Sequence, residues 1–95
     1  MGKNKKCIVI TVIGKDEVGI VAKVASALAE NNINIIDINQ KILGDEIFAM
    51  TMLADRATSP MSLPELTEQL SAAVSDMGLD VRVQDAEVFR FMHRV

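Results

Sequence analysis

The sequence predicts an α+β domain whose elements follow the order strand, helix, strand, strand, helix, strand. Three observations support this order. The runs 8–13 and 46–54 are almost entirely apolar or β-branched, which is typical of strands buried on both faces. The segments 20–30 and 63–77 repeat apolar residues at helical spacing. The two remaining extended segments are polar along part of their length, as edge strands are.

The first strand and the first helix are joined by a short polar turn that begins at Gly14 and ends at Gly19. We expect the strand to stop at Gly14 and the helix to start at Ile20, because Ile20, Val24 and Leu28 fall on one helical face. The turn then lies at the start of a helix, where free backbone N–H groups and the positive end of the helix dipole can bind a carboxylate.

The first helix is expected to end at Asn31 and Asn32, and a hairpin follows it. Its first strand covers residues 33–42, a turn at Gly44 and Asp45 reverses the chain, and residues 46–54 return. Strict alternation divides the first of these strands into two faces, which hold Asn34, Ile36, Ile38, Gln40 and Ile42 on one side and Ile33, Ile35, Asp37, Asn39 and Lys41 on the other.

The second helix begins with a capping box, Ser62 followed by Glu65, and closes at Gly78. The last strand, residues 79–86, alternates strictly, with Leu79, Val81 and Val83 facing the core and Asp80, Arg82 and Gln84 facing solvent. We assign residues 1–86 to one domain and residues 87–95 to a C-terminal tail.

This order is the split βαβ arrangement of the ferredoxin-like architecture, a four-stranded antiparallel sheet with two helices on one face. Right-handed crossovers place the first and third strands at the centre of the sheet. The face without helices then exposes an apolar stripe from these two strands. We predict that another subunit, or the tail residues Phe89 to Met92, covers this stripe.

Composition excludes several classes of function. The 95 residues suffice for one domain, and the net charge of −3 with three Phe and no Trp or Tyr argues against nucleic acid. The single cysteine, Cys7, excludes an internal disulfide and indicates a reducing compartment. The sequence shows neither an apolar run of membrane-spanning length nor a signal peptide, so we expect a cytoplasmic protein without a membrane partner.

Residues suited to catalysis are scarce. His93 is the only histidine and lies two residues from the C-terminus, and Cys7 has no recognisable catalytic partner. The neighbouring carboxylates of Asp16 and Glu17 lack the opposed environments that an acid and base pair needs. We therefore expect no enzyme activity, no cofactor and no metal site.

Each turn residue also has a purely structural explanation. Asp16 can cap the first helix, Gly14 can end the strand, and Gly19 can allow close packing between helix and strand. Spacing alone leaves the structural and functional explanations open.

Residues 7–86 resemble the ACT domain, a βαββαβ module that binds amino acids and related metabolites and regulates enzymes or transcription. The resemblance rests on the turn KDEVGIVA and on the following helix and strand, which end in ENNINIIDINQKI. It is strongest to free-standing single-domain ACT proteins, and it extends to the ACT domains of the glycine cleavage system repressor and formyltetrahydrofolate deformylase. Val18 stands where the family usually has proline, which makes the loop less rigid.

The resemblance implies a ligand site made of Asp16, Gly19, Ile20 and Asn34. Asp16 would contact the polar end of the ligand, the amides of Gly19 and Ile20 would hold a carboxylate, and Asn34 would reach the ligand across a dimer interface. Asp37, Asn39 and Gln40 are weaker candidates on the same strand. The implied protein is a non-enzymatic regulatory homodimer, or higher homo-oligomer, that binds a small amino-acid-like ligand. The alternative is an interaction module without a ligand, whose open sheet face or tail binds a protein partner.

Overall fold

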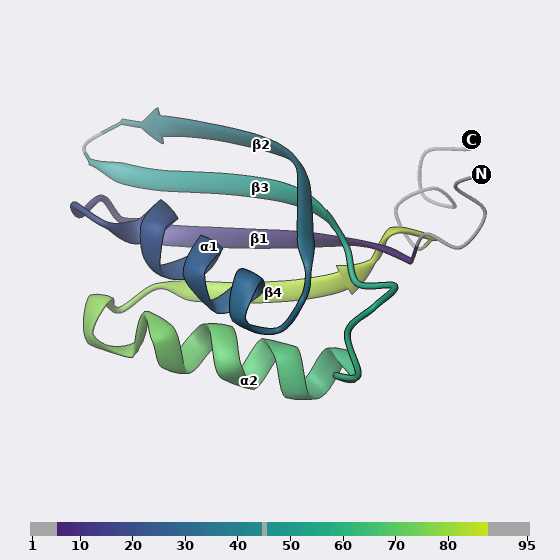
Figure 1. The fold of residues 1–95 in the computed structure, drawn as a ribbon. Helices are drawn as coiled ribbons and strands as arrows, with labels where there is room; N and C mark the ends of the chain where they lie inside the picture. The colour runs from purple at the N-terminus through teal and green to yellow at the C-terminus, as the bar shows by residue number, and fades with distance from the viewer. Residues whose placement is uncertain (1–5, 45, 88–95) are drawn as a thin grey trace.

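The computed structural model describes residues 6–44 and 46–87. Within these residues the chain forms the predicted order of elements, with one extra 3-10 turn (Figure 1). The elements are β1 (Cys7–Lys15), α1 (Ile20–Glu30), β2 (Asn34–Leu43), β3 (Ile47–Asp55), α2 (Leu63–Ala73), the 3-10 turn η2 (Ser75–Met77) and β4 (Asp80–Asp85).

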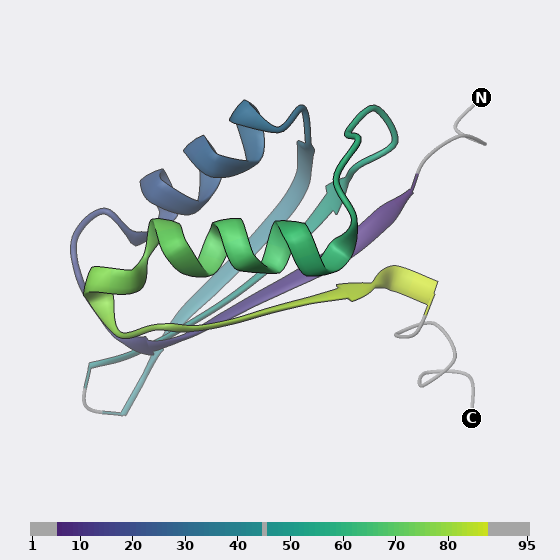
Figure 2. The same ribbon diagram turned by 90° about the horizontal axis from the view of Figure 1, so that it is seen from below.

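The four strands form one antiparallel sheet in the order β2-β3-β1-β4. Both helices pack on the same face of this sheet, as Figure 2 shows in a view from below. The ferredoxin-like prediction is confirmed, including the central position of the first and third strands. The face that carries no helix is called the open face below.

The core lies between the helices and the inner face of the sheet. Alternate residues of β1 and β3 point toward the helices, and the helices contribute matching apolar stripes. Side chains with at most 2% of their surface exposed include Ile8, Ile10 and Val12 of β1, Met50 and Met52 of β3, Ile20, Val24 and Leu28 of α1, and Leu66 and Leu70 of α2.

β2 contains a bulge that changes which residues share a face. Ile35 pairs with Ala54 and Asp37 pairs with Leu53, so Ile36 is an extra residue without a cross-strand partner. Ile35 therefore lies on the helix side and Asp37 on the open face. The expectation that these two residues share a face is wrong, because strict alternation fails wherever a strand carries an inserted residue.

The start of α2 is capped as predicted, but the helix ends earlier than predicted. Glu65 N donates to Ser62 Oγ at 3.3 Å and Ser62 N donates to Glu65 Oε1 at 2.9 Å, which completes the capping box. The α-helix ends at Ala73, four residues earlier than expected, and the chain then tightens into η2. Gly78, with φ of 66°, closes this turn in the left-handed conformation.

The capping box makes stability depend on pH. Hydrogen bonds from Ser62 hold the pKa of the Glu65 carboxyl below its ordinary value of 4.5. A carboxylate with a depressed pKa stabilises the fold above its ordinary pKa, and this contribution is lost as pH falls through the folded-state value. We expect a Glu65→Gln chain to unfold at lower urea than the unchanged chain at about pH 7, with the difference shrinking at about pH 3. A difference that is constant with pH would contradict this assignment.

Gly14 lies inside β1 rather than after it, since the strand continues to Lys15 and pairs Gly14 with Phe48. A Cβ at this position would lie 2.6 Å from Leu79 Cδ2 and 3.2 Å from Leu79 Cα. Gly14 thus allows the segment before β4 to approach β1 closely.

We expect Gly14→Ala to lower the free energy of unfolding by about 1–3 kcal/mol in urea titration. Val18→Ala, at a side chain that is 97% exposed, is the control and should have no measurable effect.

Candidate functional site

The turn between β1 and α1 leaves the start of the helix uncapped by any side chain. Gly19 is the N-cap residue, with φ of 93° and ψ of 2°, and no side chain accepts a hydrogen bond at this position. Asp16 therefore makes no capping hydrogen bond to α1. The first amides of a helix have no acceptor within the helix, so those after Gly19 can donate to an external group. Ile20 as a whole residue is 2% exposed, so its side chain belongs to the core and offers no contact to a ligand.

Asp16 is fixed through its backbone and not through its side chain. Asp16 N donates to Glu46 O at 2.8 Å, which ties the turn to the start of β3. The Asp16 side chain is exposed, and Val18 projects into solvent beside it. The turn thus combines a backbone fixed by a hydrogen bond, a solvent-exposed carboxylate and the positive end of a helix dipole. These features suit a ligand that carries both a carboxylate and an ammonium group.

Asn34 lies at the opposite end of the sheet from the turn. It pairs with Asp55, which in turn pairs with Cys7, whereas the turn follows Lys15 at the other end of β1. The rise of a strand places these two ends about 26 Å apart. Figure 1 shows the start of β2 far from the start of α1. One chain therefore brings Asp16, Gly19 and Ile20 together and does not add Asn34 to them.

The weaker candidates of β2 divide between the two faces of the sheet. Gln40 pairs with Met50 on the helix side. Asp37 and Asn39 line a shallow hollow of about 540 Å³ on the open face. Its lining is completed by Thr11, Ile13, Lys41, Ala49, Met50, Thr51 and Leu53. Sequence reasoning missed Thr11 and Thr51 as part of this surface, although their alternation with buried neighbours on central strands is visible in the sequence.

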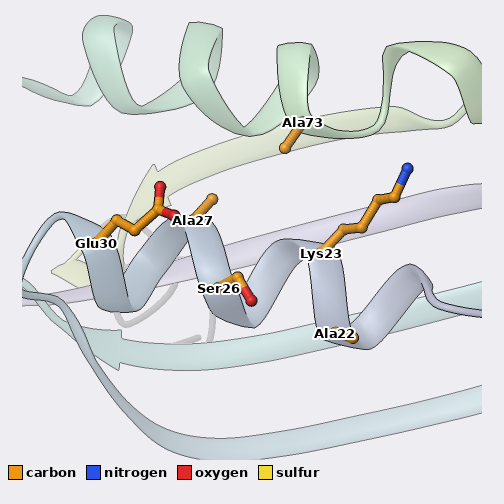
Figure 3. Close-up of a pocket in the computed structure, with 6 residues that line it drawn as sticks. All are labelled: Ala22, Lys23, Ser26, Ala27, Glu30 and Ala73. Atoms are coloured by element: carbon orange, nitrogen blue, oxygen red, sulfur yellow. The ribbon is translucent and has the colours of Figure 1, made fainter.

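A second groove, of about 290 Å³, lies between the two helices (Figure 3). It is lined by Ala22, Lys23, Ser26, Ala27 and Glu30 of α1 and by Ala73 of α2. Lys23 Nζ lies 3.4 Å from Asp76 Oδ2, and both side chains are well exposed. None of the predicted site residues lines this groove. Exposed ion pairs of this kind contribute little free energy to stability. The groove therefore offers a ligand only small side chains and one weak ion pair.

The free edge of β2 carries most of the exposed large apolar side chains in the described part of the chain. The helices cover the centre of the sheet and leave this edge strand open on its outer side (Figure 1). The exposed residues of β2 are Ile36, Ile38, Ile42 and Leu43, with exposures between 39% and 56%. A strand edge with unpaired backbone groups and apolar side chains is a surface for strand pairing.

Neither a metal site nor a membrane-spanning helix is found in residues 6–44 and 46–87. These residues contain no group of three or more His, Cys, Asp or Glu side chains arranged to hold a metal ion. None of their helices combines the length and the apolar character needed to cross a bilayer. His93 and the apolar tail residues Phe89 to Met92 lie outside the described residues.

Comparison with known proteins agrees with this geometry. The profile of the ACT domain family matches residues 6–84. The UPF0237 protein of Methanopyrus kandleri is 51% identical over 87 residues, which cover 92% of this chain and 96% of that protein. The solved ACT domain protein from Streptococcus pneumoniae is 33% identical with a TM-score of 0.76, over 88% of this chain and 93% of its own.

Two larger proteins contain the same domain. A formyltetrahydrofolate deformylase from Pseudomonas syringae matches with a TM-score of 0.77 and 25% identity, over 90% of this chain and 29% of its own. A glycine cleavage system transcriptional repressor matches with a TM-score of 0.70 and 25% identity, over 84% of this chain and 45% of its own. The fold thus occurs as a part of a deformylase and as a part of a transcriptional repressor. With the profile match over nearly the whole length, the chain belongs to the ACT domain family.

Proposed function

We propose that this chain is a non-enzymatic regulatory module that binds an amino acid, or a related small metabolite, at a homodimer interface. The observation that carries the proposal is the start of α1, where Gly19 in the left-handed conformation presents helix amides that no side chain caps. A ligand carboxylate fits these amides and the positive helix end. The exposed carboxylate of Asp16, three residues away in the turn, fits the ammonium group of the same ligand.

The second half of the site comes from another copy of the chain. When two β2 edges pair antiparallel about a two-fold axis, the first residue of one strand lies near the last residues of the other. Leu43, at the end of β2, pairs with Ile47, and Ile47 pairs with Lys15 at the turn. This arrangement brings Asn34 of the partner subunit to the end of the sheet that holds the turn. It also covers the exposed apolar residues of β2.

Ligand binding at the subunit interface can regulate how the two subunits assemble. A ligand held by both subunits binds the dimer and not the monomer, so it stabilises the dimer by mass action. It also favours whichever arrangement of the two subunits binds it more tightly. The output is therefore a change in assembly or in subunit arrangement, without chemistry on the ligand.

Thermal shift against the twenty amino acids tests this proposal. A ligand at about one hundred times its Kd stabilises the chain by about 2.7 kcal/mol, which raises Tm by about 10–20 °C for a domain of this size. We expect at least one amino acid to do so, and we expect Asp16→Ala to abolish the shift without lowering the Tm of the free protein. Glu17→Ala, at the adjacent exposed carboxylate, is the matched control and should keep the shift. A panel without any shift, at both low and high protein concentration, would refute the proposal.

A second candidate function is favoured by the apolar residues on the open face, where Ile13 and Ile47 are 44% and 41% exposed. Under this alternative the chain is an interaction module without a small ligand, and its open face or its tail binds an enzyme or regulator. Removal of residues 89–95 should then release a captured protein in pull-down and size-exclusion experiments, and Asp16→Ala should change nothing. The opposite pattern supports the ligand site.

A further inference from the structure

The free edge of β2 carries opposite charges on either side of Asn39. Asp37 lies two residues before Asn39 and Lys41 lies two residues after it, and all three side chains are exposed on the open face. Their cross-strand neighbours on β3 are uncharged. The order along the edge is therefore a negative charge, an amide and a positive charge at even spacing.

Neither of these charges has an ion-pair partner in its own chain. The two ion pairs found in residues 6–44 and 46–87 join α1 to η2 and two residues of β4, and neither involves these side chains. Asp37 and Lys41 lie four residues apart, which is about 13 Å along a strand and too far for contact. A partner strand can lie beside both of them, because β2 is an edge strand of the sheet (Figure 1).

The bulge makes Asn39 the central residue of the β2 ladder. Ile36 has no partner on β3, so the ten residues of β2 occupy nine positions, opposite the nine residues of β3. Asn39 pairs with Thr51, which is the middle residue of β3. A two-fold axis at Asn39 therefore pairs the whole length of β2 with its copy.

We propose that two copies of the chain join through their β2 edges with the two-fold axis at Asn39, so that each Asp37 contacts Lys41 of the partner subunit. This inference rests on the proposed homodimer and fixes its register. An axis at Asp37 or at Lys41 would place like charges opposite each other, which is destabilising. An axis at Ile38 or at Gln40 would leave both charges without a charged partner. Only the axis at Asn39 opposes two pairs of unlike charges.

The same register completes the proposed ligand site. An axis at Asn39 matches Asn34, the first position of β2, with Leu43, the last position, of the partner subunit. Leu43 pairs with Ile47, and Ile47 pairs with Lys15, after which the turn begins. Asn34 of one chain is thus level with the start of the partner's turn. Moving the axis by one residue would shift it by two positions, about 7 Å along the strand.

Charge reversal tests this register in the protein without ligand. We expect Asp37→Lys alone, and Lys41→Asp alone, to raise the dissociation constant of the dimer about tenfold or more, because like charges then face each other twice. The double variant restores both pairs, so its dissociation constant should lie within about threefold of that of the unchanged chain. Sedimentation velocity measures these constants. A double variant that dissociates as readily as the single variants would overturn the proposal.

Asp80→Lys is the matched control for the charge reversal. Asp80 is an exposed carboxylate of β4, at the opposite edge of the sheet, and its replacement changes the net charge by the same amount as Asp37→Lys. It should leave the dissociation constant unchanged. An equal effect of Asp80→Lys and Asp37→Lys would mean that net charge, and not a pair at the β2 edge, controls the dimer, which also overturns the proposal.

Disulfide formation locates the axis directly. In a Cys7→Ser chain, Asn39→Cys places two thiols opposite each other with Cα atoms about 4.5–5.5 Å apart, which a disulfide spans. The copies of Ile38, and those of Gln40, are then diagonal neighbours about 7–8 Å apart, at the limit of that range. We expect Asn39→Cys to form the cross-linked dimer about tenfold faster than Ile38→Cys or Gln40→Cys. Faster cross-linking of either of these two, or no cross-link in any variant, would overturn the proposal.

The register and the ligand site can fail separately. Both experiments use the protein without ligand, whereas the thermal shift reports on the turn. A dimer with its axis at Asn39 that responds to none of the twenty amino acids would refute the ligand site and support the register. A chain that shows the thermal shift but cross-links at another residue of β2 would refute the register and support the ligand site.

Discussion

An Ile38→Lys chain is expected to be monomeric at concentrations where the unchanged chain is the proposed dimer. Ile38 lies near the middle of β2 and is 39% exposed on the helix side of the free edge. Two-fold pairing of β2 edges places both copies of this residue close to the axis, so one substitution removes two apolar side chains and adds two like charges. We expect the dissociation constant to rise about a hundredfold or more, measured by sedimentation velocity.

Thr51→Lys is the control for this experiment. Thr51 is exposed at the centre of the open face, away from the β2 edge. It should leave the dimer intact if the subunits join through their edges. A chain that becomes monomeric with Thr51→Lys, and not with Ile38→Lys, would show that the open face forms the interface.

Replacing Leu70 by alanine is expected to have the largest effect on folding. Leu70 is fully buried on the inner face of α2 and belongs to the cluster that joins both helices to the sheet. Truncation of a buried leucine costs about 2–5 kcal/mol, through lost burial and the cavity that remains. A domain of this length has a free energy of unfolding of only about 5–14 kcal/mol.

The measurement is thermal unfolding followed by circular dichroism, with Val18→Ala as the exposed control. We expect Leu70→Ala to lower Tm by about 10–30 °C and Val18→Ala to leave it unchanged. Equal effects of the two substitutions would mean that α2 is not part of the core.

Most of the fold could be predicted because the spacing of apolar residues along the chain, and the composition of each segment, depend directly on which side chains are buried. The alternation of Val81 and Val83 with polar residues marked β4 as a strand with one buried face, and the structure buries Val81 against the core. The capping box of Ser62 and Glu65 could also be predicted, because its two residues lie only three positions apart in the sequence. The bulge at Ile36 could not be predicted, because it is defined by pairing with β3 and leaves no local signal.

The candidate site can be predicted from the sequence only in part, for a related reason. The turn was recognised because a strand, a polar turn and a helix follow one another in sequence. The role of Gly14 was not, since it depends on the approach of Leu79, which lies far away in the sequence. The distance of Asn34 from the turn was also hidden, because it follows from the antiparallel register of three strands. Only a second chain can join these two parts of the proposed site.

A mixing experiment tests the shared site most directly. Asp16→Ala and Asn34→Ala chains are each expected to lose binding of the amino acid that gives the largest thermal shift, since each homodimer lacks one half of both sites. In a heterodimer of the two, one turn with Asp16 faces a partner with Asn34, so one site is complete. Random assortment of an equimolar mixture makes half of the dimers mixed, and calorimetry should then find about one ligand for every four chains. If the mixture binds no more ligand than the separate variants, or if Asn34→Ala alone binds normally, the site is not shared between subunits.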